Sequence, residues 1–426
     1  MNYQEFFSLA KEKGIENIQI TEETTKENSI YLIDKKLEDY TDSEKVIYFI
    51  KAEVAGKTER LLTEYLDGTI IDLLIEKIKE TESRYEDEYL EETENNTIIE
   101  TENVDITEEI PKLLKLDELK EEYKYTKSLE ILYCDSYNKI RIINNKGVDI
   151  STTSHNYDLY VEASAEKEDT IATYSHSILV SDKSKINFTD NIKEALELAS
   201  LATTKKKLET KRYNIVLNNK VASYIIAHLQ DMLSAEAIHQ KKSCLENKLN
   251  QQVFSKLINI VEDPQNKKFP GYVTFDKEGT KTFSKELIKD GIIKTYLYDI
   301  KEAKVDNINS TGNKFNGIET RNMYVLPGSK TLEEIFENIK NGIYITHYMG
   351  SMGASINCSN GDISLQVFGY IIEDGKIVSG FEPAVLTTSI FELLSNVEEI
   401  GKDLKFSSTA VASPALYIKD ISIAGK

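Results

Sequence analysis

The stretch 361-GDISLQVFGYIIEDGKIVSG-380 indicates how the second half of this chain folds. Its Asp374-Gly375 pair is a turn signal, because both residue types tolerate the positive φ that a two-residue hairpin turn requires. We therefore expect two antiparallel strands joined at this turn. Glu278-Gly279 and Asp290-Gly291 are similar signals within residues 273–299, and they predict further hairpins there.

Glycine and proline divide the chain near residue 210. Four of the 19 glycines precede that point, and the other fifteen lie between Gly271 and Gly425. Five of the six prolines also lie in the second half of the chain. Because these residues supply turns, the second half should be rich in hairpins, whereas the first half should contain longer helices and a few strands. We predict an α+β fold, with an α/β amino-terminal region followed by a β-rich carboxy-terminal domain with a few helices.

The expected domain boundaries follow from this change of composition and from an acidic run. Residues 1–95 should form an α/β amino-terminal domain, and residues 96–211 an acidic linker with a second α+β segment. Residues 212–426 should form the β-rich carboxy-terminal domain. The acidic run lies at 86–110 and predicts a solvated linker or insert, whose role the sequence does not define.

Apolar spacing and terminal signals predict four helices besides the one treated below. Their ranges are 2–14, ended by Gly14; 68–85; 190–207, capped by Asp190 or Asn191; and 326–342, capped by Ser329 or Thr331 and stopped by Gly342.

Charge and cysteine content limit the classes of function. The chain has 52 Lys+Arg and 72 Asp+Glu, a formal net charge of -20, so no direct binding of nucleic acid is expected. Its three cysteines, Cys134, Cys244 and Cys358, are widely spaced and form no CxxC, which disfavours a disulfide scaffold or a zinc ribbon. No apolar run approaches the ~20 residues that span a bilayer. We therefore expect a cytoplasmic protein that does not associate with membranes.

The segment 224-YIIAHLQDMLSAEAIHQKKS-243 is predicted to be an amphipathic helix and carries two of the five histidines, His228 and His239. On one straight helix they share a face, about 20° apart around the axis, but lie about 16 Å apart along it. Two imidazoles that bind one zinc ion must each lie about 2.1 Å from it. This pair therefore cannot chelate one ion, and composition alone favours two histidines with local hydrogen bonds.

From about Asn218 onward, the chain resembles the TldD/PmbA family, whose members were once called modulators of DNA gyrase. Nine segments match family motifs in order and at suitable spacing. They are FDKEG (275–279), LIKDGIIKTYLYD (287–299), STGN (310–313), YVLPGSKTLEEI (324–335), NGIYIT (341–346), NGDIS (360–364), FGYIIEDGKI (368–377), EIGKDL (399–404) and DISIAGK (420–426). Each motif is weak alone, but nine in series are specific. The amino-terminal half matches only in its general layout.

In the TldD branch, the resemblance implies a metallopeptidase motif, HExxxH, on the helix that opens the carboxy-terminal domain, and a cysteine near the carboxy terminus. Aligned on KKSC (241–244), that motif falls on HLQDML. His228 matches the first histidine, but Leu229 and Leu233 stand where the glutamate and the second histidine belong. The closing segment, 404–426, has no cysteine. The chain therefore resembles the PmbA branch, also called TldE, with His228 as a vestige and no metal site of its own.

The resemblance implies a subunit of a cytoplasmic metalloprotease that acts on unfolded or modified peptides. The expected partners are a TldD-like subunit or a second copy of this chain, together with an extended peptide substrate. Zinc is expected in the TldD-like partner, and no cofactor is expected in this chain. Whether the chain is itself an enzyme stays open, because HExxxH has degenerated to HLQDML.

Two loops are expected to line a substrate cleft, by the resemblance and because their glycines permit close approach of a backbone. Their residues are Ser310, Thr311, Gly312 and Asn313 in one loop, and Gly361, Asp362 and Ser364 in the other.

Two other functions remain open on the sequence. One is a stand-alone metallopeptidase with an unrecognised site, for which His228, His347 and Cys358 are the available ligand types. The other is a homodimeric peptide-binding protein. Asp276 and Glu278 could form an acid and base pair, but the glycine that follows them favours a turn.

Overall fold

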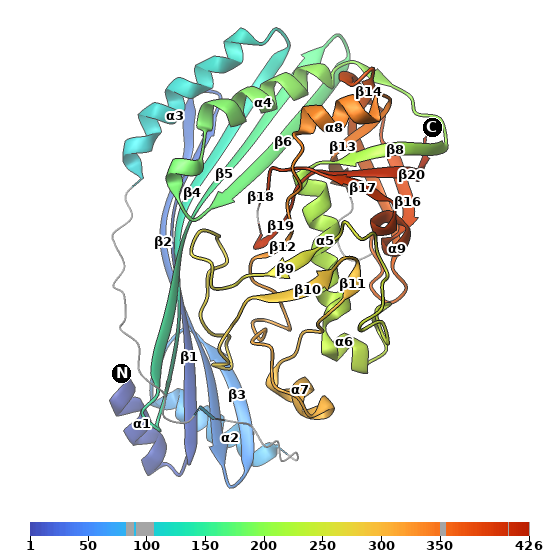
Figure 1. The fold of residues 1–426 in the computed structure, drawn as a ribbon. Coiled ribbons are helices and arrows are strands. Elements are labelled where there is room, and N and C mark those ends of the chain that lie inside the picture. The colour runs from blue at the N-terminus through green and yellow to red at the C-terminus, as the bar shows by residue number, and fades with distance from the viewer. Residues whose placement is uncertain (82–88, 91–105, 350–354, 408, 426) are drawn as a thin grey trace.

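The computed structural model describes residues 1–81, 89–90, 106–349, 355–407 and 409–425, which form three β-sheets with helices packed against them (Figure 1). The predicted α+β class is confirmed. None of the helices in these ranges is long and apolar enough to cross a membrane.

The amino-terminal part is built on one antiparallel sheet, which we call the long sheet. Its strand order is β3-β2-β1-β4-β5-β6. The strands are β1 (Asn17–Ile33), β2 (Lys36–Val54), β3 (Lys57–Thr63), β4 (Thr126–Asn144), β5 (Asp149–Lys167) and β6 (Thr170–Val180). The predicted boundary between residues 95 and 96, like most of the acidic run at 86–110, lies outside the described residues. The strands before and after this boundary belong to one sheet, because β1 pairs with β4 from Gln19 to Ile33.

Helices cover one face of the long sheet at both of its ends (Figure 1). They are α1 (Tyr3–Glu12), α2 (Gly68–Glu80), α3 (Ile110–Leu116) and α4 (Phe188–Leu201). The predicted helices at 2–14, 68–85 and 190–207 correspond to α1, α2 and α4. The predicted cap of α4 is wrong. Asn187 is the cap, because its side chain accepts the Asp190 amide, which leaves Asp190 inside the first turn.

Residues of the long sheet alternate between this helix-covered face and the opposite face, which we call the inner face. The cross-strand pair Ile131 and Val161 is buried in the core that α4 completes. The adjacent pair, Glu130 and Glu162, therefore lies on the inner face. The pairing of β1 with β4 has no register shift, and that of β4 with β5 shifts only near residue 126. The alternation consequently holds along nearly the whole sheet.

Two further sheets form the carboxy-terminal part. The small sheet has the order β11-β10-β9-β12-β19-β18. Its strands are β9 (Ile260–Glu262), β10 (Lys285–Lys289), β11 (Ile292–Ile293), β12 (Met323–Val325), β18 (Lys405–Phe406) and β19 (Val411–Ser413).

The other sheet, which we call the closed sheet, contains a ring of strand pairs, because β13, β8, β20, β16 and β14 pair in turn and β14 pairs back to β13. Its strands are β7 (Lys205–Lys206), β8 (Lys211–Leu217), β13 (Gly342–Met349), β14 (Asp362–Glu373), β15 (Lys376–Phe381), β16 (Ala384–Ser389), β17 (Val397–Ile400) and β20 (Leu416–Ala424).

The helices of this part are short except for the first. They are α5 (Asn219–Leu233), α6 (Ala235–His239), α7 (Ile300–Asp306), α8 (Leu332–Ile339) and α9 (Ile390–Ser395). The apolar face of α5 lies in the main core, together with residues of the closed and small sheets.

The turn chemistry agrees with the sequence in two hairpins. Asp374 and Gly375 have φ of 48° and 76° between β14 and β15, and Asp290 and Gly291 have φ of 50° and 74° between β10 and β11. The end of α8 differs from the prediction. Thr331 caps the helix as expected, but the helix ends at Ile339, with Lys340 (φ 56°) as its C-cap, rather than at Gly342.

Gly342 instead begins β13, and a Cβ there would lie 2.5 Å from the Asn214 carbonyl oxygen. A glycine is thus required by close strand pairing and not as a helix stop.

The single straight helix predicted at 224–243 is wrong. Helix α5 ends at Leu233, Ser234 is extended, and α6 follows in a new direction. The helix is interrupted by a tertiary contact with Leu297. The Leu297 carbonyl accepts the Ala235 amide, and the Leu297 amide donates to the Leu233 carbonyl. His239 therefore does not share one helix axis with His228.

His239 joins α6 to α7. Its Nδ1 lies 2.6 Å from Glu302 Oε2 and its Nε2 lies 3.0 Å from Asp306 Oδ1. The hydrogen bond to Glu302, with a further contribution from Asp306, raises the pKa of His239. Each ring nitrogen of His239 thus faces a carboxylate, an arrangement that favours the protonated imidazole, which donates from both nitrogens.

We predict that His239→Gln lowers the free energy of unfolding by about 1 kcal/mol at pH 6, a typical value for a partly exposed ion pair. Because the folded-state pKa exceeds the unfolded value of about 6.5, the stabilisation is full below pH 6.5 and is lost as pH rises through the folded-state pKa. Urea unfolding of both proteins between pH 5.5 and 9, chosen to bracket about 6.5, tests this. A stability difference that grew with pH would contradict it.

Candidate functional site

The inner face of the long sheet is turned toward the carboxy-terminal part, and contacts fix the two together at one end. Phe275 packs in a small core with Ile142 and Ile150 of the inner face. Lys277 Nζ lies 2.5 Å from Glu23 Oε1. Since Glu23 belongs to β1 and Ile150 to β5, the loop that follows β9 spans several strands of the long sheet.

A second set of contacts fixes the other end of the inner face. Lys220, in the first turn of α5, donates to Ser175 Oγ on β6 over 3.4 Å. His347 Nε2, on β13, lies 2.7 Å from the Ser175 carbonyl oxygen. Burial lowers the pKa of Lys220 and lowers that of His347 to about 4, so the imidazole is neutral at pH 7. The middle of the inner face thus lies between two anchored ends.

Helix α5 carries the residues that align with the metallopeptidase motif. Leu229 and Leu233 are both 0% exposed and belong to the main core. His228 is partly exposed, and its Nδ1 lies 2.9 Å from the Tyr224 carbonyl oxygen, so Nδ1 carries the proton and donates. Two buried leucines cannot bind zinc, and one imidazole is one ligand where a zinc site needs three or four. The residues present on this helix do not fit the metal site of the TldD branch.

The alternative ligand set is not brought together either. His347 contacts Ser175, whereas the Cys358 carbonyl accepts the Cys244 amide. Burial raises the pKa of Cys358 to about 11, so its thiol is protonated at neutral pH. Over the described ranges, no group of three or more His, Cys, Asp or Glu side chains is placed to hold a metal ion.

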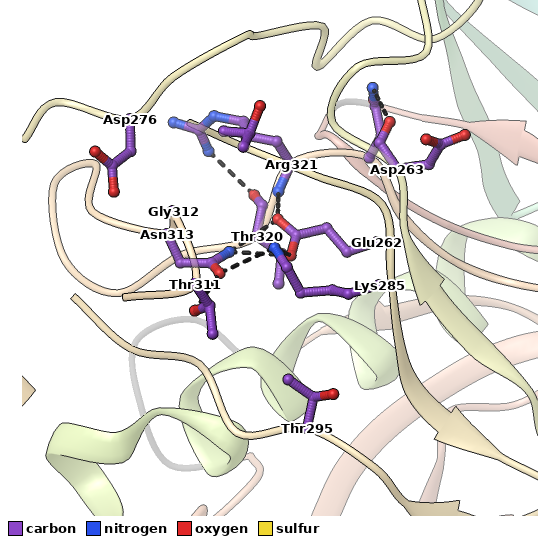
Figure 2. Close-up of polar contacts among 12 residues, drawn as sticks. Glu262, Asp263, Asp276, Lys285, Thr295, Thr311, Gly312, Asn313, Thr320 and Arg321 are labelled. Atoms are coloured by element: carbon purple, nitrogen blue, oxygen red, sulfur yellow. Dashed lines mark hydrogen bonds and ion pairs between the residues drawn. The ribbon is translucent and has the colours of Figure 1, made fainter. Parts of the chain in front are cut away.

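The loop 310–313 closes over a buried polar cluster (Figure 2). Asn313 is 0% exposed, and its Nδ2 donates to Glu262 Oε1 and Oε2 over 2.8 and 3.0 Å. Lys285 Nζ donates to Glu262 Oε2 over 2.7 Å and to Asn313 Oδ1 over 3.2 Å. The Arg321 amide also donates to Glu262 Oε1, over 2.8 Å. Every charge in this cluster is paired and hydrogen-bonded, which is the condition under which buried ions are tolerated.

The other residues of the loop hold its shape. Thr311 Oγ1 lies 2.7 Å from Asn313 Oδ1, and Ser310 Oγ donates to the Tyr298 carbonyl over 3.0 Å. Gly312 has φ 72°, and a Cβ there would lie 2.9 Å from the Lys281 carbonyl oxygen. Thr311 and Asn313 are buried, so their side chains are not available to line an open cleft. These two side chains support the loop, and of the four predicted residues Ser310 is the most exposed.

The second predicted loop lies elsewhere. Gly361 is buried, and a Cβ there would lie 2.9 Å from Ile390 and 3.4 Å from Cys244 Sγ. Asp362 and Ser364 are exposed at the start of β14, and Asp362 Oδ2 accepts the Asn360 side chain over 2.6 Å. Among the hydrogen bonds of the described residues, none joins this loop to residues 310–313. Gly361 packs against Ile390 and Cys244, whereas Asn313 contacts Glu262 and Lys285, so the two predicted groups have different neighbours.

Asp276 and Glu278 have the turn role that was favoured. Asp276 Oδ1 accepts the amides of Glu278 and Thr280 over 3.0 and 2.9 Å, and its Oδ2 accepts the Lys314 amide over 2.9 Å. Burial raises the pKa of Asp276 to about 7 despite these bonds. The carboxylate thus anchors two loops.

Sequence reasoning did not identify Glu262 and Lys285 as partners of Asn313. They lie 23 residues apart in the chain, and each resembles the many exposed charges of an acidic protein. The available signal was the apolar residues beside each, Ile260 and Val261 before Glu262 and Leu287 and Ile288 after Lys285, which indicate buried strands.

Residues 210–425 match the profile of a family described as the PmbA/TldA metallopeptidase C-terminal domain. The chain belongs to this family, and the predicted resemblance to its PmbA side is confirmed.

Two curated relatives illustrate the likeness. The metalloprotease PmbA homolog of Buchnera aphidicola is 27% identical over 220 residues, which cover 52% of this chain and 48% of that protein. The metalloprotease PmbA of Escherichia coli O157:H7 is 24% identical over 221 residues, with 52% and 48% covered. The chain thus spans about half the length of the curated relatives it matches.

Two solved structures are similar along the whole chain. A Thermotoga maritima protein named as a modulator of a DNA gyrase has a TM-score of 0.88 at 26% identity, with 99% of this chain and 100% of that chain covered. TldE from Thermococcus kodakarensis has a TM-score of 0.83 at 16% identity, with 99% of each covered, and this second likeness concerns the fold alone.

We predict that Asn313→Ala lowers the free energy of unfolding by about 2 kcal/mol or more, because it removes hydrogen bonds to the buried charges of Glu262 and Lys285. Asn316→Ala is the matched control, since Asn316 is exposed in the same loop and its Oδ1 accepts a hydrogen bond from Lys277 Nζ over 2.8 Å. Loss of this exposed hydrogen bond should cost about 1 kcal/mol or less. Urea unfolding measures both. If Asn313→Ala unfolds at the same denaturant concentration as the control, the amide does not hold the cluster together.

Proposed function

We propose that this chain is the PmbA/TldE-like subunit of a TldD/PmbA-type protease that acts on unfolded or modified peptides, and that it has no metal site of its own. The observation that carries the proposal is the position of Leu229 and Leu233, which are fully buried on the helix where the TldD branch has its metal ligands. A leucine can neither polarise water nor bind zinc. The role of the chain then lies in its surfaces.

The arrangement of the inner face supports a peptide-binding role. It is a broad sheet surface anchored to the carboxy-terminal part by Lys277 at one end and by Lys220 at the other. An extended peptide on this face would contact the side chains of the sheet, because the backbone hydrogen bonds of its inner strands are already made within the sheet. A TldD-like partner would supply the zinc and the general base, and a pair of subunits would enclose the peptide.

The partner and the compartment belong to the same proposal. A stable interface typically buries about 1,600 Å² in total, and the net charge of -20 requires that carboxylates be kept out of its centre or be neutralised there. A reducing cytoplasm suits three cysteines that are all free. A stand-alone peptidase is the competing proposal, and the same experiment separates the two.

The test is peptide hydrolysis by the chain alone and after reconstitution with a TldD-like subunit that has an intact HExxxH. We expect no turnover by the chain alone and turnover by the pair. His228→Ala should leave the activity of the pair nearly unchanged, because its imidazole is a single ligand that donates to Tyr224. Asp362→Ala, in the exposed predicted loop, should lower it.

The controls separate chemistry from assembly. A partner with Gln in place of the HExxxH glutamate should give no turnover, and size-exclusion chromatography should show that every variant pair still forms. Turnover by this chain alone, or its loss in His228→Ala with an intact pair, would show that α5 still takes part in the chemistry.

A further inference from the structure

The middle of the inner face carries three acceptor side chains on β1 and β5, the two strands that flank β4. Glu27 of β1 lies opposite Ser136 of β4, which lies opposite Asn156 of β5. Asp158 follows two residues later on β5, so it points to the same face. Glu23 of β1 and Thr152 of β5 contact the carboxy-terminal part from the inner face. Glu27 is an even number of residues from Glu23, and Asn156 and Asp158 are an even number from Thr152, so all three lie on the inner face too.

These acceptors lack the partners that buried polar groups normally have. Asn156 is 8% exposed, and its Oδ1 has no hydrogen-bond partner among the described residues. Asp158 Oδ1 is likewise without one. Among the described residues, no lysine or arginine forms an ion pair with Glu27 or Asp158. Elsewhere on this face carboxylates are paired, as Glu23 is with Lys277.

The charges at this point repel each other. Burial, with a further contribution from the negative charge of Glu27, raises the pKa of Asp158 to about 6. Cys134 of β4 lies opposite Asp158 of β5. Burial, with a further contribution from the charges of Glu27 and Asp158, raises the pKa of its thiol to about 12, so it stays neutral. Two carboxylates therefore lie on the strands that flank β4 with no cation paired to them among the described residues, and a bound cation would relieve both their repulsion and their lost hydration.

The donor set suits an organic cation better than a metal ion. The thiol is protonated, and the part of the chain that the structure describes places no three His, Cys, Asp or Glu side chains together for a metal. A primary ammonium has three N–H donors and no acceptor. Two carboxylates and one amide oxygen offer three matching acceptors.

We infer that Glu27, Asn156 and Asp158 form a subsite for a primary ammonium group of the bound peptide, carried either by a lysine side chain or by the amino terminus. The inference rests on the proposed function, because the peptide must lie along the inner face for its ammonium to reach this point. It adds a preference to that function: peptides with a correctly placed primary ammonium bind better than neutral ones of the same shape.

Three fluorescent peptides of one unfolded sequence test this by anisotropy with the full chain. One has an acetylated amino terminus and a central lysine, one a free amino terminus and norleucine in place of lysine, and one is acetylated with norleucine. Norleucine keeps the aliphatic chain of lysine without its charge. The lysine peptide, or the peptide with a free amino terminus, should bind roughly tenfold more tightly than the neutral one, as hydrogen bonds to a charged group imply.

The subsite is assigned by variants. Asp158→Asn and Glu27→Gln should each remove most of this preference and leave the affinity for the neutral peptide unchanged. Glu44→Gln is the matched control, because Glu44 is exposed on β2 and pairs with Lys26. Thermal unfolding checks each variant, and partly exposed Glu27 supplies the test if Asp158→Asn does not fold.

Each failure has a separate meaning. If all three peptides bind equally, the ammonium subsite is wrong while peptide binding stands. A preference that survives both variants also overturns the assignment. If no peptide binds the chain, alone or with a TldD-like subunit, the proposed function fails and the subsite fails with it.

Discussion

The burial of α5 is the constraint on which the carboxy-terminal part depends. Val221, Ile225, Leu229 and Met232 repeat at helical spacing and are at most 1% exposed, within a core that includes residues of two sheets. Each such side chain contributes about 1.5–3 kcal/mol by leaving water. A glutamate or histidine at residue 229 would need a charged or hydrogen-bonding partner in this apolar core. The same helix face therefore serves packing here, where the TldD branch uses it for chemistry.

The polar interior has the complementary role of fixing the loops around that core. The Glu262 carboxylate joins β9, β10 and the loop 310–313 through Lys285 and Asn313. Asp276 joins its own turn to the backbone of Lys314. These bonds lie at the boundary with the long sheet, so the inner face meets a carboxy-terminal surface that is held rigidly. A binding surface formed between the two parts depends on this rigidity for its shape.

Local signals in the sequence predicted local structure well. Asp374-Gly375 gave the expected hairpin because its conformation is set by two residues, and Thr331 gave the expected cap through its own side chain. The features that sequence reasoning missed are set by contacts between distant residues. The break after Leu233 depends on pairing with Leu297, and one long sheet arises because β1 pairs with β4 across more than a hundred residues of chain.

The candidate site shows the same difference between local signals, which could be predicted, and contacts between distant residues, which could not. The family could be predicted from nine ordered motifs. The sequence also has leucines at 229 and 233, where the resemblance places metal-site residues, but the absence of a metal site stays a prediction. The burial of individual residues could not be predicted. Asn313 and Asp362 are both polar residues in glycine-containing loops, yet Asn313 is fully buried and Asp362 is exposed. The acceptors on the inner face were not identified because Glu27 and Asn156 become neighbours only through Ser136 on the strand between them.

The metal content of the purified chain tests the central claim most directly. If α5 has exchanged its ligands for core packing, the chain should carry far less than one zinc ion per molecule after dialysis against zinc-free buffer. Elemental analysis by plasma mass spectrometry against measured protein concentration gives this ratio. One zinc ion per chain that disappears in His228→Ala would contradict the account, since it would show a working metal site on this helix.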